Sequence, residues 1–289
     1  MPSVKDLRDR IRSLKNTQQI TKAMKQVAGA KIRRAENARK QARPYADTIA
    51  EMLRDLTQAV AHVDHPFMRP GKSGAPAGIL LMTADKGLAG AFNSNVIRMA
   101  ESYARERGGA LFYTVGLKGR NAVRRMGITD RPSWPLGGTS KLDTAREVAR
   151  RAAADFDRGE ISELVLVSSK LLSMLSQKPE TRRLIPIEGA AAGDGIGDDK
   201  PRGAVEFAPS PEFVLSRLLP KYLEFSIYSA MLETDAAFFA AQLVAMSNAT
   251  DNASKLIDEL TIAMNNARQA AITKELLEIV AGAEALGVA

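Results

Sequence analysis

The sequence predicts an α/β protein with a long antiparallel coiled coil made from its two ends. Residues 221–289 contain no proline and only two glycines, and both ends of the chain repeat apolar residues in steps of four and three. Between the ends, residues 78–206 instead alternate short apolar runs with helical patterns. A helix over residues 221–289 would reach roughly 100 Å at 1.5 Å per residue, so it needs a second long helix beside it.

The N-terminal coiled-coil helix is expected over residues 1–63. Ser3 is its predicted N-cap, and Asp6, three residues later, is a weak capping-box partner. The apolar seam turns polar around Thr21 and then resumes, and Pro44 is expected to bend the helix because it removes a backbone hydrogen bond. The seam residues are Val4, Leu7, Ile11, Leu14, Met24, Ala28, Ile32, Ala35, Tyr45, Ile49, Met52, Leu56 and Val60.

The C-terminal coiled-coil helix is expected over residues 209–289. Its charge complements that of the N-terminus: residues 1–43 carry a net charge of +10, and residues 221–289 carry −5. Opposite charges favour two helices lying together. The predicted seam is Leu232, Ala236, Phe239, Leu243, Met246, Thr250, Ala253, Ile257, Leu260, Met264, Ala267 and Ala271.

The middle of the chain is expected to form a linker and a separate domain. Residues 64–77 are rich in proline and glycine, which is typical of a linker. Residues 78–208 predict a Rossmann-like α/β domain with a mostly parallel sheet. Strands are expected at 78–83, 110–115 and 164–168, weaker strands at 128–129, 184–187 and 204–207, helices at 93–107, 117–126 and 140–157, and an acidic glycine loop at 189–203.

The α/β domain has turns where ligands often bind, but no catalytic set. A structural turn is favoured for Asp85–Gly90, and a plain strand-to-helix turn is favoured over an anion site for Gly116–Arg120. Residues 71–73 lack the first glycine and the helix of a phosphate-binding loop. There is no cysteine, and His62 and His65 lack further ligands for zinc. We therefore expect no catalytic, cofactor-binding or metal-binding residues.

The residues alone leave three functions open. The basic face of residues 5–43 suits a helix bound to nucleic acid, or a helix threaded through an acidic protein collar. The collar is favoured because Tyr45 is the only aromatic residue before Phe67, and because it explains the apolar seam. The third function is a small-molecule enzyme that uses the α/β domain. No apolar run reaches the length of a membrane span.

The C-terminus is unusually apolar for a chain end. Such an end predicts either core packing or insertion into an apolar socket of a partner. The residues concerned are Ile272, Leu276, Leu277, Ile279, Val280, Leu286 and Val288.

Four blocks of sequence closely resemble the gamma subunit family of the F-type rotary ATP synthase, of bacterial type. They lie in the family's order and spacing over essentially the whole chain. The blocks are Ile11–Gln18 with Ile20–Met24, Thr83–Gly90 with Asn93, Met246–Asn252, and Ala267–Leu276.

The resemblance implies a non-catalytic rotor-shaft subunit of the proton-transporting ATPase. The coil would run up a ring of three alpha and three beta subunits, with the α/β domain on the ring of membrane c subunits, beside epsilon and indirectly linked to delta. Proton flow would turn the shaft, drive ATP synthesis at beta and allow regulation of ATP hydrolysis. The implied location is peripheral, on the cytoplasmic face of the bacterial inner membrane.

The resemblance also implies which residues meet these partners. Contacts with the beta catch region would fall to Met24, Arg268, Gln269, Thr273 and Glu275. Contacts with the c ring at the foot would involve Phe207 and Pro209. Arg268 is suited to bidentate bonding with a beta carboxylate.

Overall fold

The computed structural model describes residues 3–59, 65–128, 132–138, 140–187 and 210–287. The chain divides into two compact units. The coil unit comprises Met1–Ala28 with Leu243–Ala289, and the α/β unit comprises Gly29–Gln242. Two long helices, α1 (Val4–Ala59) and α5 (Pro211–Gly287), each contribute residues to both units.

The two long helices confirm the predicted helical ends of the chain. Helix α1 is unbroken through Pro44, and α5 is unbroken through Pro220. At the start of α1, the Asp6 carboxylate accepts a hydrogen bond from the Ser3 amide at 3.1 Å, and the Asp6 amide donates to Ser3 Oγ at 3.2 Å. The pair therefore forms the predicted reciprocal cap. Hydrogen bonding to Ser3, to its side chain first and to its backbone second, lowers the pKa of Asp6.

The coil unit has a narrow core with a polar centre. Its buried apolar residues are Leu7, Ile11, Ala28, Met246, Ala253 and Ile257. Between them, Thr21 is buried and its hydroxyl lies 2.8 Å from that of Thr250. Next to this pair, the Lys25 ammonium donates to the Ser247 hydroxyl at 3.0 Å. Going forward along α1 from Thr21 to Lys25 corresponds to going backward along α5 from Thr250 to Ser247. The two helices are therefore antiparallel.

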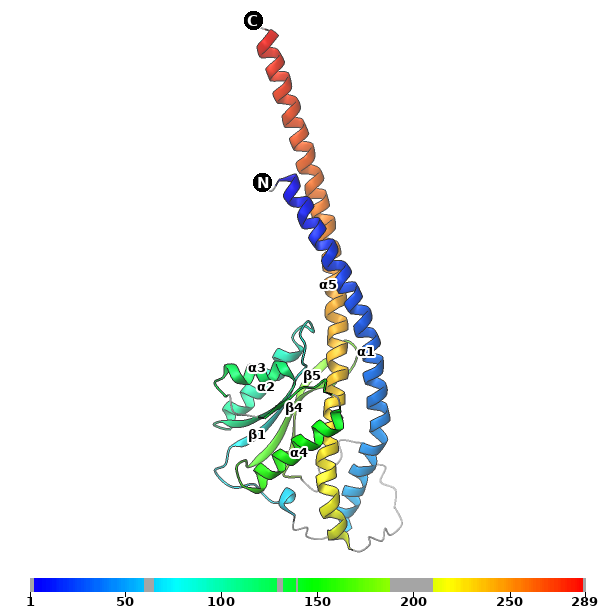
Figure 1. The fold of residues 1–289 in the computed structure, drawn as a ribbon, viewed down its shortest axis with the longest axis vertical. Coiled ribbons are helices and arrows are strands. Elements are labelled where there is room, and N and C mark those ends of the chain that lie inside the picture. The colour runs from blue at the N-terminus through cyan, green and yellow to red at the C-terminus, as the bar shows by residue number, and fades with distance from the viewer. Residues whose placement is uncertain (1–2, 60–64, 129–131, 139, 188–209, 288–289) are drawn as a thin grey trace. The chain divides into compact units, whose positions relative to one another are not determined.

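The α/β unit contains a five-stranded sheet in the order β3-β2-β1-β4-β5 (Figure 1). All neighbouring strands are parallel except β4 and β5, which confirms the mostly parallel sheet. The strands are β1 (Ala77–Met82), β2 (Ala110–Val115), β3 (Ser133–Trp134), β4 (Glu163–Leu171) and β5 (Gln177–Ile185). The remaining helices are α2 (Phe92–Glu106), α3 (Leu117–Arg125), α4 (Lys141–Asp157) and the short 3₁₀ helix η1 (Pro66–Met68).

Helices cover both faces of the sheet. On one face, Ile79 and Leu81 of β1 pack with Val96 and Ala100 of α2 and with Val123 of α3. On the other face, Leu80 and Met82 belong to a larger core with residues of α4, α5 and α1. Alternate residues of β1 therefore serve different layers, as the pleat of a strand requires. The α5 members of the larger core are Leu215, Leu218, Leu219, Leu223, Ile227, Ala230 and Met231.

Two strand predictions need correction. The short third strand is at Ser133–Trp134, whereas Ile128 packs beside the α2 and α3 cluster and Thr129 lies outside the described residues. The strand predicted at 184–187 is β5, which begins at Gln177 and ends at Ile185. Most of β5 is half-buried or exposed edge strand, so its polar residues carry no apolar signal. The predicted strand at 204–207 and the loop at 189–203 lie outside the described residues.

Candidate contact surfaces of the two long helices

The stretch of α5 from residue 268 to residue 281 is not covered by any described residue of its own chain. Every residue from 268 to 281 is exposed. Arg268, Gln269, Thr273 and Glu275 all lie in this stretch, and the Thr273 hydroxyl donates to the Gln269 carbonyl at 3.0 Å. Within the described part of the chain, Arg268 forms no ion pair. Its guanidinium is therefore available to a carboxylate of another molecule.

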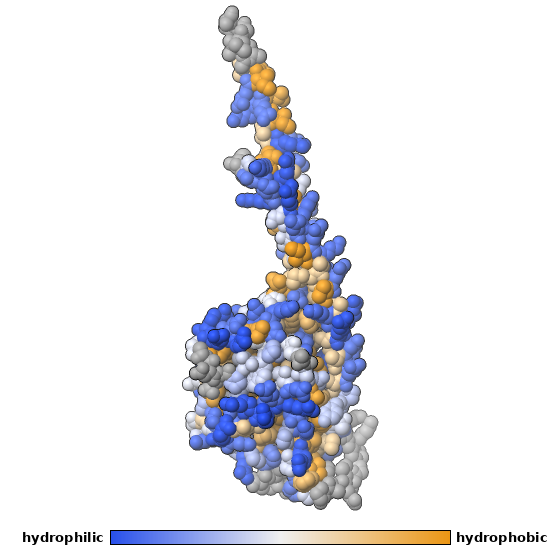
Figure 2. Space-filling view, in the orientation of Figure 1, coloured by the Kyte–Doolittle hydropathy of each residue, from blue (hydrophilic) through white to orange (hydrophobic). Residues whose placement is uncertain are grey.

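Apolar side chains accompany these polar residues on the same bare stretch, and Figure 2 shows apolar surface near this end of the helix. An isolated helix gains little stability by itself, and exposed apolar surface of this extent is typical of a contact site. The exposed fractions are 49% for Ile272, 58% for Leu276, 64% for Leu277, 67% for Ile279 and 55% for Val280.

Met24 lies at a different level of the coil unit. It is half-buried on α1, next to Lys25, which contacts Ser247 of α5. Arg268 is about 30 Å further along α5 than Ser247, at 1.5 Å per residue. The structure therefore does not bring Met24 together with the Arg268 group. Phe207 and Pro209 lie outside the described residues.

The Asp85–Gly90 turn is structural, as expected. The Asp85 carboxylate accepts hydrogen bonds from the amides of Leu117 at 2.9 Å, Leu136 at 3.1 Å and Gly137 at 2.8 Å. Asn93 closes the same turn, with its side chain bonded to Ala84 N at 2.9 Å. These bonds join the ends of β1, β2 and β3.

The strand-to-helix turn at Gly116–Arg120, favoured over an anion site, is also held by contacts within the protein. The Gly119 amide donates to the Thr83 hydroxyl at 2.7 Å. Gly116 has a positive φ of 102°, and a Cβ atom there would lie 2.0 Å from the Thr83 carbonyl oxygen. Glycine is therefore required for the close approach of two strand ends. Among the described residues, no group of His, Asp or Glu is arranged to hold a metal.

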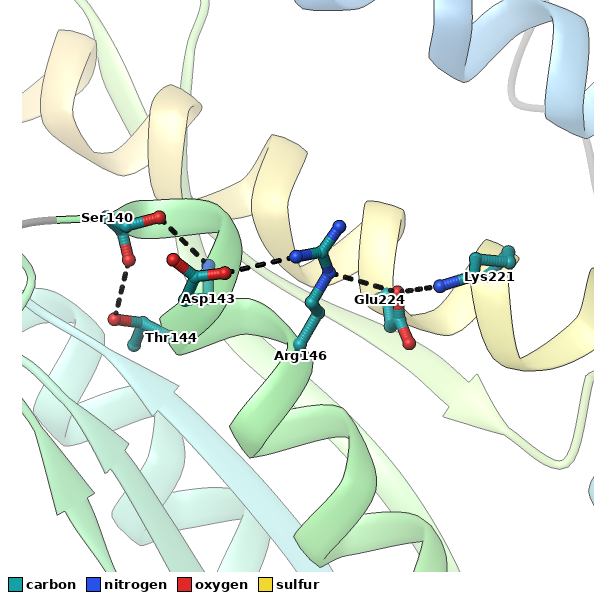
Figure 3. Close-up of polar contacts among 6 residues, drawn as sticks. All are labelled: Ser140, Asp143, Thr144, Arg146, Lys221 and Glu224. Atoms are coloured by element: carbon teal, nitrogen blue, oxygen red, sulfur yellow. Dashed lines mark hydrogen bonds and ion pairs between the residues drawn. The ribbon is translucent and has the colours of Figure 1, made fainter.

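Polar contacts join α4 to α5 inside the α/β unit (Figure 3). Ser140 caps α4 by accepting from the Asp143 amide at 3.2 Å. One turn later, Arg146 bonds Asp143 at 3.1 Å and approaches Glu224 of α5 at 3.8 Å. Lys221, also on α5, completes this series of contacts by bonding Glu224 at 2.8 Å. The sequence analysis did not predict this contact between α4 and α5.

A second group of polar residues on α5 was also missed. Glu233, Thr234 and Asp235 interrupt an otherwise apolar stretch of α5 and contact four other elements. Three consecutive polar residues in a buried helix segment are the signal that could have identified them, because buried polar groups need partners.

The described residues form two long packed helices, an α/β layer and an exposed stretch of α5 that carries large apolar side chains. An exposed apolar helix stretch is typical of a protein that binds partner subunits. Within the described residues, no helix has the length and apolar character needed to cross a lipid bilayer. The ATP synthase family model matches residues 3–286.

The relatives found by comparison identify the family. A gamma chain from Heliobacterium modesticaldum is 42% identical over 99% of this chain and 100% of its own length. A gamma chain from Pelotomaculum thermopropionicum is 44% identical over the same shares. The fold resembles a chain of the Euglena gracilis mitochondrial ATP synthase rotor, with a TM-score of 0.68 and 18% identity over 93% of this chain and 98% of that one. The chain belongs to the ATP synthase gamma-chain family.

Proposed function

We propose that this chain is the central rotor shaft that couples proton flow to ATP synthesis at the beta subunits. The observation that carries the proposal is the bare end of α5 in a chain that matches its gamma-chain relatives over their full length. A helix that exposes both an apolar stripe and an arginine without an ion pair to any described residue is suited to a partner that surrounds it. Membership of the family supports a ring of three alpha and three beta subunits as that partner.

Within this proposal, the two parts of the bare helix have different tasks. Arg268, Gln269, Thr273 and Glu275 form polar contacts with beta that break and re-form as the shaft turns. The apolar residues from Ile272 onward turn inside an apolar socket, where contacts without direction resist rotation little. Met24, lower on the coil, meets beta at a separate contact.

The α/β unit is proposed as the foot of the shaft. It would rest on the c ring through Phe207 and Pro209, with epsilon beside it and delta linked indirectly, on the cytoplasmic face of the inner membrane. We propose the same four segments as above: coil helix 1–63, linker 64–77, α/β domain 78–208 and coil helix 209–289. A solved structure of the Tetrahymena thermophila mitochondrial ATP synthase central stalk and c ring, which contains a chain of similar fold, supports this arrangement.

The test is assembly and turnover with Arg268→Ala. Because Arg268 has no ion pair with a described residue of its own chain, the isolated variant should keep the parent helicity by circular dichroism. Losing a charge-assisted contact with beta should reduce ATP synthesis by roughly ten- to a hundredfold, as about 1.5–3 kcal/mol of interaction is lost. Lys255→Ala, another exposed cation of α5, is the matched control.

Two outcomes separate the site from the function. If Arg268→Ala assembles and turns over like the parent, the residue assignment is wrong. If the tagged parent chain fails to co-purify alpha and beta at three copies each, the rotor proposal itself is wrong.

A further inference from the structure

Three consecutive residues of α5 hold the helix to its surroundings in different directions. Glu233 reaches α1 and the end of β4, Thr234 reaches β1, and Asp235 reaches α4. Successive residues of a helix point about 100° apart, so the three side chains cover about 200° of its circumference. All of these contacts lie inside the α/β unit.

Glu233 uses both carboxylate oxygens to join three elements. Oε2 accepts from Arg39 of α1 at 3.0 Å, and Oε1 accepts from the backbone amide of Leu171 at 2.8 Å. Leu171 is the last residue of β4, so the carboxylate ties the end of the sheet to both long helices. The Arg39 Nε is buried and has no hydrogen bond among the described residues. A buried donor without a partner costs free energy of folding, and Arg39 stays in contact with Glu233 despite this cost.

Thr234 and Asp235, the residues next to Glu233, complete this junction between α5 and its neighbouring elements. Thr234 is fully buried, and its hydroxyl points to the Met82 sulfur at 3.9 Å, at the end of β1. Asp235 pairs with Lys141, the first residue of α4, at 2.9 Å, with both side chains only about a fifth exposed (21% and 22%). An ion pair that is largely shielded from water is weakened less by salt than an exposed one.

Directional contacts add to the resistance that the surrounding core supplies. Attraction between apolar side chains depends on buried area rather than direction, and the core resists displacement through its close packing. A hydrogen bond depends in addition on its angle and weakens steeply when the donor turns away from the acceptor. A torque applied between the sheet and α5 therefore strains these directional contacts together with the packed core.

We propose that Glu233, Thr234 and Asp235 are positioning residues that form a torsional anchor between the sheet and the two long helices. The proposal rests on the rotor function and assigns the place within this chain where torque passes from the α/β layer into the helices. Glu233 and Asp235 make these contacts with Arg39 of α1, Leu171 of β4 and Lys141 of α4.

The experiment measures the torsional stiffness of the chain in the assembled ATP synthase. Because the chain has no cysteine, a single cysteine introduced at exposed Arg98 of α2 carries a bead, while the alpha and beta subunits are fixed to glass and stalled with a non-hydrolysable ATP analogue. The angular variance of the bead reports how tightly the α/β layer follows the helices.

The double variant Glu233→Gln with Asp235→Asn should roughly double this variance, because two charge-assisted directional contacts are lost while side-chain size is kept. ATP-driven proton pumping against a gradient should fall more than ATP hydrolysis, a split that a general loss of folding would not produce. Asp47→Asn is the control, since it breaks an exposed Arg43–Asp47 pair within α1 alone.

An unchanged variance in assembled complexes would overturn the anchor. If the double variant does not assemble, the single variant Asp235→Asn, which leaves both Glu233 contacts in place, tests the proposal instead. The expected increase in the angular variance of the bead is then smaller. Failure of the parent bead to rotate with ATP would instead contradict the rotor function.

Discussion

Helix α5 behaves differently in the two units to which it contributes. Within the α/β unit, from Leu215 to Ala241, it is packed against the sheet, α4 and α1, and Ile227 and Met231 are fully buried. Within the coil unit the described residues of its own chain cover one stripe of α5, and residues 268 to 281 are all exposed. One continuous helix is therefore stabilised by its own fold in one region and left for a partner in the other.

This difference indicates where the stability of the chain resides. The α/β unit buries large aliphatic side chains on both faces of a sheet, which is the main favourable contribution to folding. The coil unit buries mainly small or widely spaced residues around a threonine pair. The coil therefore depends more on what surrounds it.

The largest expected effect separates the two regions of α5 directly. Ile227→Ala should lower the free energy of unfolding by about 2–5 kcal/mol, because it leaves a cavity in the main core. Leu277→Ala, at a residue that is 64% exposed, should change it by less than about 0.5 kcal/mol. Denaturant unfolding followed by the fluorescence of Trp134, the single tryptophan, measures both. Equal losses would mean that the end of α5 packs against its own chain.

An intermediate effect is expected at the polar centre of the coil unit. Thr250→Val removes the hydroxyl that lies 2.8 Å from Thr21, and should destabilise the coil by about 1 kcal/mol. Thr250→Ser keeps the hydroxyl and should be closer to the parent. Hydrogen exchange of the peptides around Thr21 and Thr250 reports the opening of this region. Faster exchange for the serine variant than for the valine variant would show that the hydroxyl contact is not what stabilises it.

The smallest effect is a pH dependence in the α/β unit. His65 Nδ1 accepts from the Phe67 amide at 3.1 Å, and burial lowers the pKa of His65 below 6.5. The unfolded chain then binds the proton more readily, so stability should fall as pH drops through 6.5 toward the folded pKa. His65→Asn keeps an acceptor without titrating there. Thermal melting between pH 7.5 and 5.5 should show a smaller decline for the variant; identical declines would contradict this role.

Local signals explain what could be predicted from the sequence. Repeated apolar steps, the reciprocal cap at Ser3 and Asp6, and the apolar runs of β1, β2 and β4 all act over a few residues, so the pattern determines them. Strand β5 was largely missed because an exposed edge strand has polar residues that read as loop. The third strand was misplaced because two residues carry too little pattern to locate it.

The residues of the candidate site divide in the same way. Resemblance to the family predicted Arg268 and its neighbours as contact residues, and the structure added that they are exposed and that Met24 lies far along the coil from them. The junction at Glu233 depends on contacts with residues 39, 141 and 171, which only folding brings together.

The sequence by itself determined that this chain would form two long helices and an α/β layer, because helix and strand periodicity are properties of neighbouring residues. Only the tertiary structure decided which stretch of α5 is buried and which is bare, and where the helix is tied to the sheet. Burial and directional polar contacts depend on residues distant in the chain, and no local pattern specifies which of those will meet.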